Sequence, residues 1–96
     1  MNGNSKNAHY KKIVKSRLYP QIMGMMVHFN IKMKELAQIV NVPYASIRAG
    51  LNDVDKISIE RLEQIKEILS EHIYSEYAGS SIYKKYLIEH GEMTDD

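Results

Sequence analysis

The stretch from Lys32 to Asn52, KMKELAQIVNVPYASIRAGLN, constrains the fold more than any other part of the chain. Its apolar residues recur at helical spacing, so they would bury one side of a first short helix. Ile47 and Leu51, four residues apart, would bury one side of a second helix. The apolar residues of the first helix and its end are Leu36, Ala37, Val40 and Val42.

A tight turn must join these two helices, because few residues separate their apolar stripes. Asn41 falls at the reversal, and Asn is the non-glycine residue that best tolerates a left-handed backbone. Pro43 suits the first turn of the next helix, where its missing N–H has no partner to lose. We therefore expect helices over about Met33 to Val40 and about Pro43 to Leu51.

Charge is segregated along the chain, although the formal net charge is only +1. Residues 1–56 carry nine Lys or Arg against three acids, and residues 57–96 carry four against nine. The first half therefore has a net charge of +6 and the second half −5. Such a molecule has one face suited to phosphates and another that repels them, rather than an ordinary mixture of solvated charges.

Further helices are expected on both sides of this stretch, which predicts an all-α fold. A leading helical pattern starts at Tyr10 and should end or kink near Tyr19, because Pro20 disfavours helix before it. The main first helix then follows to Phe29, with Asn30 as a left-handed cap. Its expected core residues are Ile22, Met25, Met26 and Phe29.

The second half predicts a long helix from about Ile59 to Ile73, capped by Ser58. Its glutamates should stay in water, while a stripe of aliphatic residues faces the core. A last helix is expected from about Ile82 to His90, capped by Ser80 or Ser81. The inward stripe of the long helix consists of Ile59, Leu62, Ile65, Leu69 and Ile73, widened by Ile68.

The stretch at 32–52 resembles, without gaps, a helix-turn-helix of the lactose-repressor family. The matching residues are Leu36, Ala37, Asn41, Val42, Pro43, Tyr44, Ser46, Ile47, Leu51 and Asn52. Leu18, Ile22, Met25 and Ile31 are similar to the first helix of the wider lambda-repressor and Cro-like group, and residues 57–69 to its closing helix. The resemblance implies a compact helical bundle with a DNA-binding helix-turn-helix, plus a short C-terminal helix.

Three positions depart from that pattern. Met33 stands where the group often has Gln, so the polar contact of that residue is not expected here. Asn41 replaces the common turn Gly without difficulty. Gly50 occupies a position that is usually apolar, and it costs about 1 kcal/mol of helix stability.

The second short helix is expected to enter the major groove of double-stranded DNA. With Ile47 and Leu51 inward, its period turns the predicted base-reading residues outward. Arg48 would either pair with a guanine or hold a phosphate, and the sequence leaves both open. The base-reading set is Tyr44, Ala45, Arg48 and Ala49. The predicted phosphate contacts are Lys32, Lys34, Ser46, Asn52 and Lys56.

The C-terminal region is rich in tyrosine, a residue favoured at protein interfaces. We expect it to support a homodimer, because one helix-turn-helix reads too few base pairs for useful specificity. The alternative is that the same residues pack within the chain. The predicted interface consists of Tyr77, Ile82, Tyr83, Tyr86 and Leu87.

Several classes of function find no support in the residues. Cysteine is absent, and His9, His28, His72 and His90 are scattered, so no metal site, cofactor or catalytic residue is expected. No phosphate-cradling glycine loop or nucleophile elbow occurs. Without a long apolar run or a signal-peptide core, the protein is expected to be cytoplasmic, with no membrane association and no small-molecule ligand.

The predicted domain organisation has three parts: a flexible arm over residues 1–9, a DNA-binding domain over 10–73, and an extension over 74–96 with a frayed tail. The predicted function is a small sequence-specific transcriptional regulator of the size found in phages, prophages or plasmids. Repression is the default, and activation or an architectural role in recombination stays open. The alternative is a helical protein-interaction module, such as an antirepressor or antitoxin-like adaptor, built on the same core. Weak overall charge, two alanines at reading positions and a tyrosine-rich C-terminal region favour that alternative.

Overall fold

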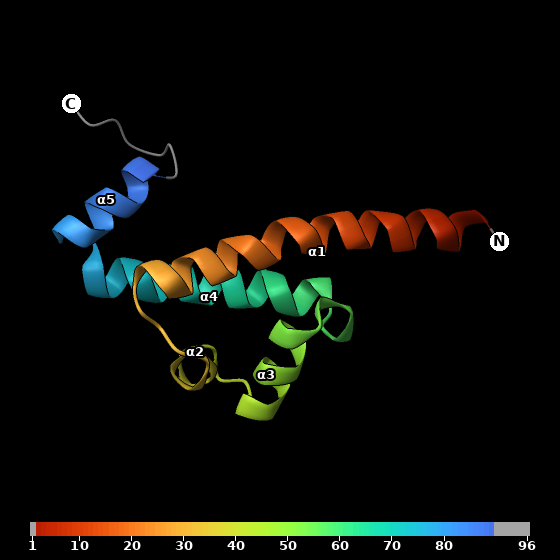
Figure 1. The fold of residues 1–96 in the computed structure, drawn as a ribbon, viewed down its shortest axis with the longest axis horizontal. Helices are drawn as coiled ribbons and strands as arrows, with labels where there is room; N and C mark the ends of the chain where they lie inside the picture. The colour runs from red at the N-terminus through yellow and green to blue at the C-terminus, as the bar shows by residue number, and fades with distance from the viewer. Residues whose placement is uncertain (1, 90–96) are drawn as a thin grey trace.

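Two long helices lie side by side and run in the same direction, with the shorter helices packed around them (Figure 1). The structure is a computed structural model that describes residues 2–89, with side chains described from residue 10 except at 11 and 54. Its helices are α1 (Asn2–His28), α2 (Met33–Val40), α3 (Tyr44–Asn52), α4 (Ile59–Tyr77) and α5 (Ser81–Glu89), with a 3-10 turn, η1 (Val54–Lys56). Within residues 2–89 there is no strand, so the predicted all-α class is confirmed.

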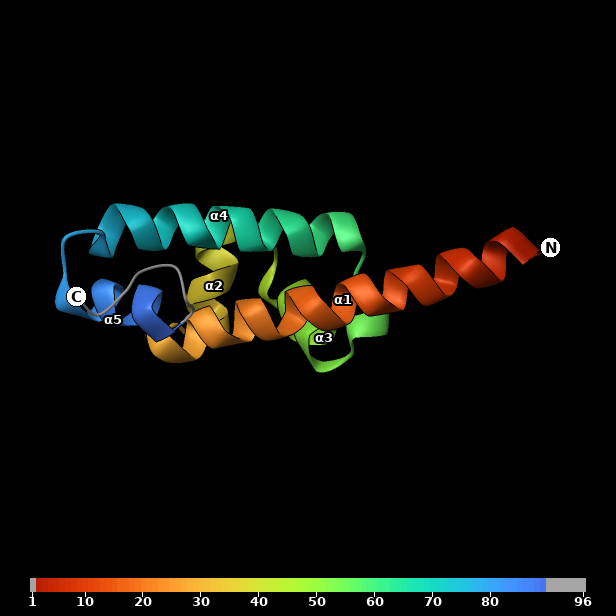
Figure 2. The same cartoon turned by 90° about the horizontal axis from the view of Figure 1, so that it is seen from above.

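The helices α2 and α3 lie on one side of the α1–α4 pair (Figure 1), and α2 runs across the pair when seen from above (Figure 2). The helix α5 packs at the end where α1 stops, and the start of α1 extends beyond the other helices at the opposite end. The core between these layers is entirely apolar among the described residues. Its members are Ile22, Met25, Met26, Phe29, Ile31, Leu36, Ala37, Val40, Ile47, Leu51, Ile57, Leu62, Ile65, Leu69 and Ile73.

The helix α1 is longer than the sequence pattern predicts. It begins at Asn2, within the region predicted as an arm, and it continues through Pro20. Of the two alternatives at Tyr19, the predicted helix end is therefore wrong, and the kink stays a prediction. Pro20 lacks the N–H that would bond to the carbonyl of Ser16, a loss that costs about 3 kcal/mol in a helix interior. The helix persists because residues on both sides of Pro20 pack against the same core.

The turn between α2 and α3 forms as predicted. Asn41 caps α2 in the left-handed conformation, with φ 56° and ψ 47°, and its N–H bonds to carbonyls of the last turn. Pro43 immediately precedes α3, and its carbonyl accepts the N–H groups of Ser46 and Ile47. Asn30 ends α1 in the same left-handed conformation, with φ 54°, as predicted. The chain therefore reverses within three residues, Asn41–Pro43.

The helix α4 is capped as predicted, since the N–H of Arg61 donates to the Ser58 hydroxyl at 3.1 Å. Its stripe is buried at Leu62, Ile65, Leu69 and Ile73, while Ile59 is half-buried and Ile68 is exposed. The helix continues to Tyr77, so the domain boundary expected at residue 73 falls inside it. It continues because Tyr77, four residues after Ile73, extends the stripe onto the core.

The helix α5 starts at Ser81, and Ser80 caps it by accepting the N–H of Tyr83 at 3.2 Å. The predicted C-terminal end at His90 and the predicted frayed tail lie outside the described residues. On the α1 side, His28 fastens α5 through both ring nitrogens: Nε2 lies 3.1 Å from the carbonyl of Ile82, and Nδ1 lies 3.3 Å from the carboxylate of Glu89. The last helix is thus tied to the end of the first.

Two glycines inside helices are expected to respond in opposite ways to a larger side chain. A Cβ at Gly24 would meet nothing within 4 Å, so Gly24→Ala should raise the free energy of unfolding by about 0.5–1 kcal/mol through helix propensity. A Cβ at Gly50 would lie 3.0 Å from Cδ1 and 3.1 Å from Cβ of Ile57. Gly50→Val should therefore lower stability by about 1–3 kcal/mol. Urea denaturation of both variants checks this, and a stabilised Gly50→Val would contradict it.

Candidate nucleic-acid interface

The helix α3 has one fully buried side and one open side. Ile47 and Leu51 are 0% and 1% exposed, and Gly50 lets Ile57 pack closely against the helix backbone. This explains why glycine stands at a position that the resemblance makes apolar: Ile57 fills the space from the other side. The underside of α3 is thereby held on the core, and the rest of its surface is left to solvent.

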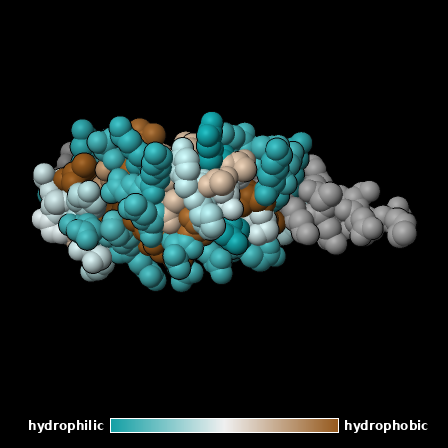
Figure 3. Space-filling view, turned by 90° about the horizontal axis from the view of Figure 1, so that it is seen from below, coloured by the Kyte–Doolittle hydropathy of each residue, from teal (hydrophilic) through white to brown (hydrophobic). Residues whose placement is uncertain are grey.

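All four predicted base-reading residues lie on that open side. Tyr44, Ala45, Arg48 and Ala49 are exposed, with Tyr44 at 38%. Figure 3 views the molecule from below, the side on which α2 and α3 lie in Figure 1, and this face is mainly hydrophilic with small apolar interruptions. The Arg48 guanidinium forms no ion pair within residues 2–89. It is therefore available to an external acceptor.

The beginning of α3 faces α2 across a shallow groove. The groove has a volume of about 630 Å³ and is lined by residues of both helices and of their connection, among them Lys34, Gln38, Asn41 and Tyr44. The Lys34 ammonium lies 5.7 Å from the centre of the Tyr44 ring, within cation–π distance. This contact places a cation beside the first residue of α3. Lys32, also predicted to contact phosphate, is exposed just before α2.

A second hollow, of about 270 Å³, lies on the other flank of α3. It brings together the predicted phosphate residues Ser46 and Lys56 with two residues that the sequence reasoning did not assign, Ser58 and Arg61. These four supply two cations and two hydroxyls to one concave site. The cap at Ser58 places Arg61 in the first turn of α4, but only the packing of η1 and α4 beside α3 brings it to this hollow.

Asn52, the last predicted phosphate residue, is exposed at the end of α3, but acids flank it. Asp53 follows directly, and its carboxylate accepts the backbone N–H of Asp55 at 3.1 Å. Both aspartates are exposed, so this end of α3 is less favourable to phosphate than the Lys56 side. The structure therefore groups Ser46 with Lys56 and leaves Asn52 beside negative charge.

Tyr19 fixes α3 to α1, a role that the sequence reasoning missed. Its hydroxyl donates to the carbonyl of Leu51, in the last turn of α3, where no helical N–H is available to that carbonyl. The two residues are 32 positions apart, so no local pattern could reveal the contact. Tyr19 thereby fixes where the C-terminal end of α3 lies against the bundle.

Removing only this hydroxyl tests the contact. Tyr19→Phe should lower the free energy of unfolding by about 0.5–1.5 kcal/mol, the net contribution of one hydrogen bond. The matched control is Tyr10→Phe, because the Tyr10 side chain is 66% exposed. Urea denaturation measures both, and equal stability of the two variants would show that the Tyr19 hydroxyl contributes nothing.

The predicted dimer residues divide into two groups. The rings of Tyr77, Tyr83 and Tyr86 surround Phe29, with centroids 5.0, 6.3 and 5.2 Å from its own. These three are half-buried against the core of their own chain. Leu87 is also half-buried, while Ile82 is 38% exposed. The aromatic edge therefore contacts Phe29 of its own chain and keeps part of its surface exposed, and the predicted homodimer stays a prediction.

Among residues 2–89, no group of three or more His, Asp or Glu side chains is arranged to hold a metal ion. None of the helices over the same residues is long and apolar enough to cross a membrane. Comparison with models of protein families, with characterised proteins and with solved structures gave no match.

Proposed function

We propose that the chain is a sequence-specific DNA-binding regulator of transcription in which α2 and α3 act as a helix-turn-helix. One observation carries the proposal: α3 buries its apolar side completely, while every residue predicted to contact DNA is exposed. An α-helix fits the major groove, and α3 is held from below without any covering element on its reading residues. The exposed set is Lys32, Lys34, Tyr44, Ala45, Ser46, Arg48, Ala49, Asn52 and Lys56.

The chemistry of this surface suits a DNA duplex. Arg48 presents a planar fork of donors that matches O6 and N7 of guanine. Ala45 and Ala49 are small enough to let the helix approach the groove floor and to contact thymine methyl groups. Lys34 on one flank, and Lys56 with Arg61 on the other, are placed to hold phosphates on each side of the groove.

The regulator is proposed to act as a cytoplasmic repressor of the kind found in phages, prophages or plasmids. It would block a promoter by occupying it. A single α3 reads few base pairs, so the operator is proposed to hold two half-sites about 34 Å, one helical turn, apart, each bound by one chain of a dimer. Because the tyrosines of α5 are half-buried, the dimer is proposed to use their exposed surface together with Ile82. Selection of bound duplexes from a random pool tests this directly, since a palindromic consensus supports two copies and a single half-site does not.

Arg48→Ala is the sharpest test of the reading helix. It should weaken binding to the selected site by about 1–3 kcal/mol, or weaken binding to all sequences alike if Arg48 holds a phosphate. The change should leave stability within about 0.5 kcal/mol, because the side chain is exposed. Lys85→Ala on α5, the helix at the far end from α3 (Figure 1), is the control. Fluorescence anisotropy with labelled duplexes measures the affinities, and unchanged binding by Arg48→Ala would remove α3 as the reader.

The rival function, a protein-interaction module, gives a different result in the same experiments. Such a module would show no DNA binding even at low salt, and the random pool would yield no consensus. Arg48→Ala would then leave every DNA titration unchanged, because the unsubstituted chain would have no affinity for DNA.

A further inference from the structure

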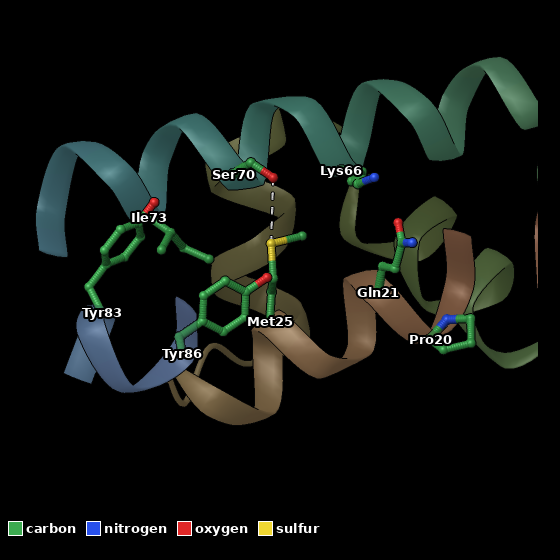
Figure 4. A pocket seen from close by; sticks show the side chains of 8 residues that line it. All are labelled: Pro20, Gln21, Met25, Lys66, Ser70, Ile73, Tyr83 and Tyr86. Atoms are coloured by element: carbon green, nitrogen blue, oxygen red, sulfur yellow. Dashed lines mark hydrogen bonds between the residues drawn. The ribbon is translucent and has the colours of Figure 1, made fainter. Parts of the chain in front are cut away.

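A hollow of about 560 Å³ lies between α1, α4 and α5, on the face away from α2 and α3. Figure 4 looks onto it, with α4 above, α1 below and α5 at one end. The volume falls in the range of small-molecule sites, about 300–1,000 Å³. None of the residues proposed to contact DNA lines it, so whatever occupies this hollow does so independently of α3. Its lining residues are Pro20, Gln21, Met25, Lys66, Ser70, Ile73, Tyr83 and Tyr86.

The floor and one end of the hollow are apolar and aromatic. Met25 and Ile73 form the floor and are 3% and 1% exposed. The Ser70 hydroxyl donates to the sulfur of Met25 at 3.5 Å, which holds this flexible side chain in place (Figure 4). The half-buried rings of Tyr83 and Tyr86 stand at the α5 end. A thioether beside aromatic rings favours a flat aromatic body, because sulfur–aromatic contacts add to apolar burial.

The opposite end of the hollow is polar and positively charged. Lys66 from α4 and Gln21 from α1 lie there, on either side of the groove (Figure 4). Lys66 is the sole charged residue among the lining residues, and within residues 2–89 its ammonium forms no ion pair. Lys66 and Ser70 also line an adjacent hollow together with Glu63 and Glu67, but neither carboxylate forms an ion pair with the Lys66 ammonium. A half-buried cation without a paired anion, next to an amide donor, is suited to a carboxylate.

We propose that this hollow, here called the α1–α4–α5 pocket, binds a small aromatic carboxylic acid. The aromatic body would lie on Met25 and Ile73 against the tyrosine rings, and the carboxylate would accept hydrogen bonds from Lys66 and Gln21. The sequence alone predicts no small-molecule ligand, because the lining residues come from three helices and form no local motif. This binding does not depend on the proposed DNA-binding function, so either can fail without the other.

A matched pair of probes tests the proposal: 2-naphthylacetate and its neutral amide, 2-naphthylacetamide. The acid should bind the full chain saturably, with one site, and about tenfold more tightly than the amide, because only the acid forms charge-assisted hydrogen bonds. Isothermal titration gives the affinities. Methyl NMR locates the site, with shifts expected at Met25 and Ile73. Equal affinity of the two probes, absence of saturation, or shifts confined to other methyl groups would overturn the proposal.

Two lysine variants separate the charge from the pocket shape. Lys66→Met keeps the aliphatic stem, so it should weaken binding of the acid about tenfold and leave binding of the amide unchanged. Lys84→Met, at an exposed lysine of α5 outside the pocket lining, should change neither probe. If Lys66→Met binds the acid as tightly as the unsubstituted chain does, Lys66 is not the carboxylate partner and the proposed site is wrong.

Discussion

Raising the salt concentration from about 50 to about 200 mM is expected to weaken DNA binding about 500-fold, which is the largest change anticipated for this protein. The estimate counts about five phosphates neutralised by the cations around α3, each releasing about 0.9 counterion, for a slope of about −4.5 in log affinity against log salt. Fluorescence anisotropy over a salt series measures that slope. The five cations are Lys32, Lys34, Lys56, Arg61 and, in its phosphate-holding alternative, Arg48.

Two of these cations, Lys56 and Arg61, line one hollow beside α3, so their share of the salt dependence can be measured separately. Lys56→Gln with Arg61→Gln should make the slope shallower by about 1.8, because two phosphate contacts are lost. Lys84→Gln with Lys85→Gln removes the same charge from α5 and should leave the slope unchanged. A slope near zero for the unsubstituted chain would contradict the DNA-binding proposal, and an equal effect of the two double variants would show that only net charge matters.

Ile47→Ala is expected to lower the free energy of unfolding by about 2–5 kcal/mol, the range for truncating a buried aliphatic side chain. Ile47 is 0% exposed and lies on the underside of α3, between the reading residues and the core. The loss combines the transfer free energy of the missing methyl groups with the cavity that remains. Because small domains are stabilised by only about 5–15 kcal/mol, such a loss is a large fraction of the total.

Urea denaturation followed by far-ultraviolet circular dichroism measures this effect. The control is Ile68→Ala on α4, because Ile68 is 38% exposed and its truncation should cost less than about 1 kcal/mol. Similar losses for the two variants would mean that α3 is not clamped onto the core as described. Arg48→Ala, on the opposite side of the same helix, should weaken DNA binding while leaving the free energy of unfolding nearly unchanged.

The sequence predicted most accurately the parts of the fold whose signals are local. The helices α2 and α3, their Asn41 turn and the Ser58 cap depend on spacing and on residues with one preferred backbone conformation. Predictions failed where contacts between residues far apart in the sequence determine the local structure. Pro20 predicts an end or a kink, and α1 does not end there because residues before and after Pro20 share one core.

The candidate sites show the same division. Exposure of Arg48 and burial of Ile47 follow from helical period alone, whereas Arg61 joins Lys56 only when η1 and α4 bring them together. The tyrosines of α5 suit an interface or a core equally well, because each combines a large apolar ring with a polar end. Their packing depends on Phe29, far upstream, so composition could not decide it.

The two pairs of packed helices differ in how much chain separates their members. Three residues separate α2 from α3, but residues 29–58 separate α1 from α4, whose packing is the most extensive in the fold. Closing the longer loop costs more entropy before any contact compensates for it, so the nucleus for folding should be the short hairpin and its neighbours, with the long pair joining late. Substitutions that weaken the contact between α1 and α4 should then raise the unfolding rate while leaving the folding rate nearly unchanged.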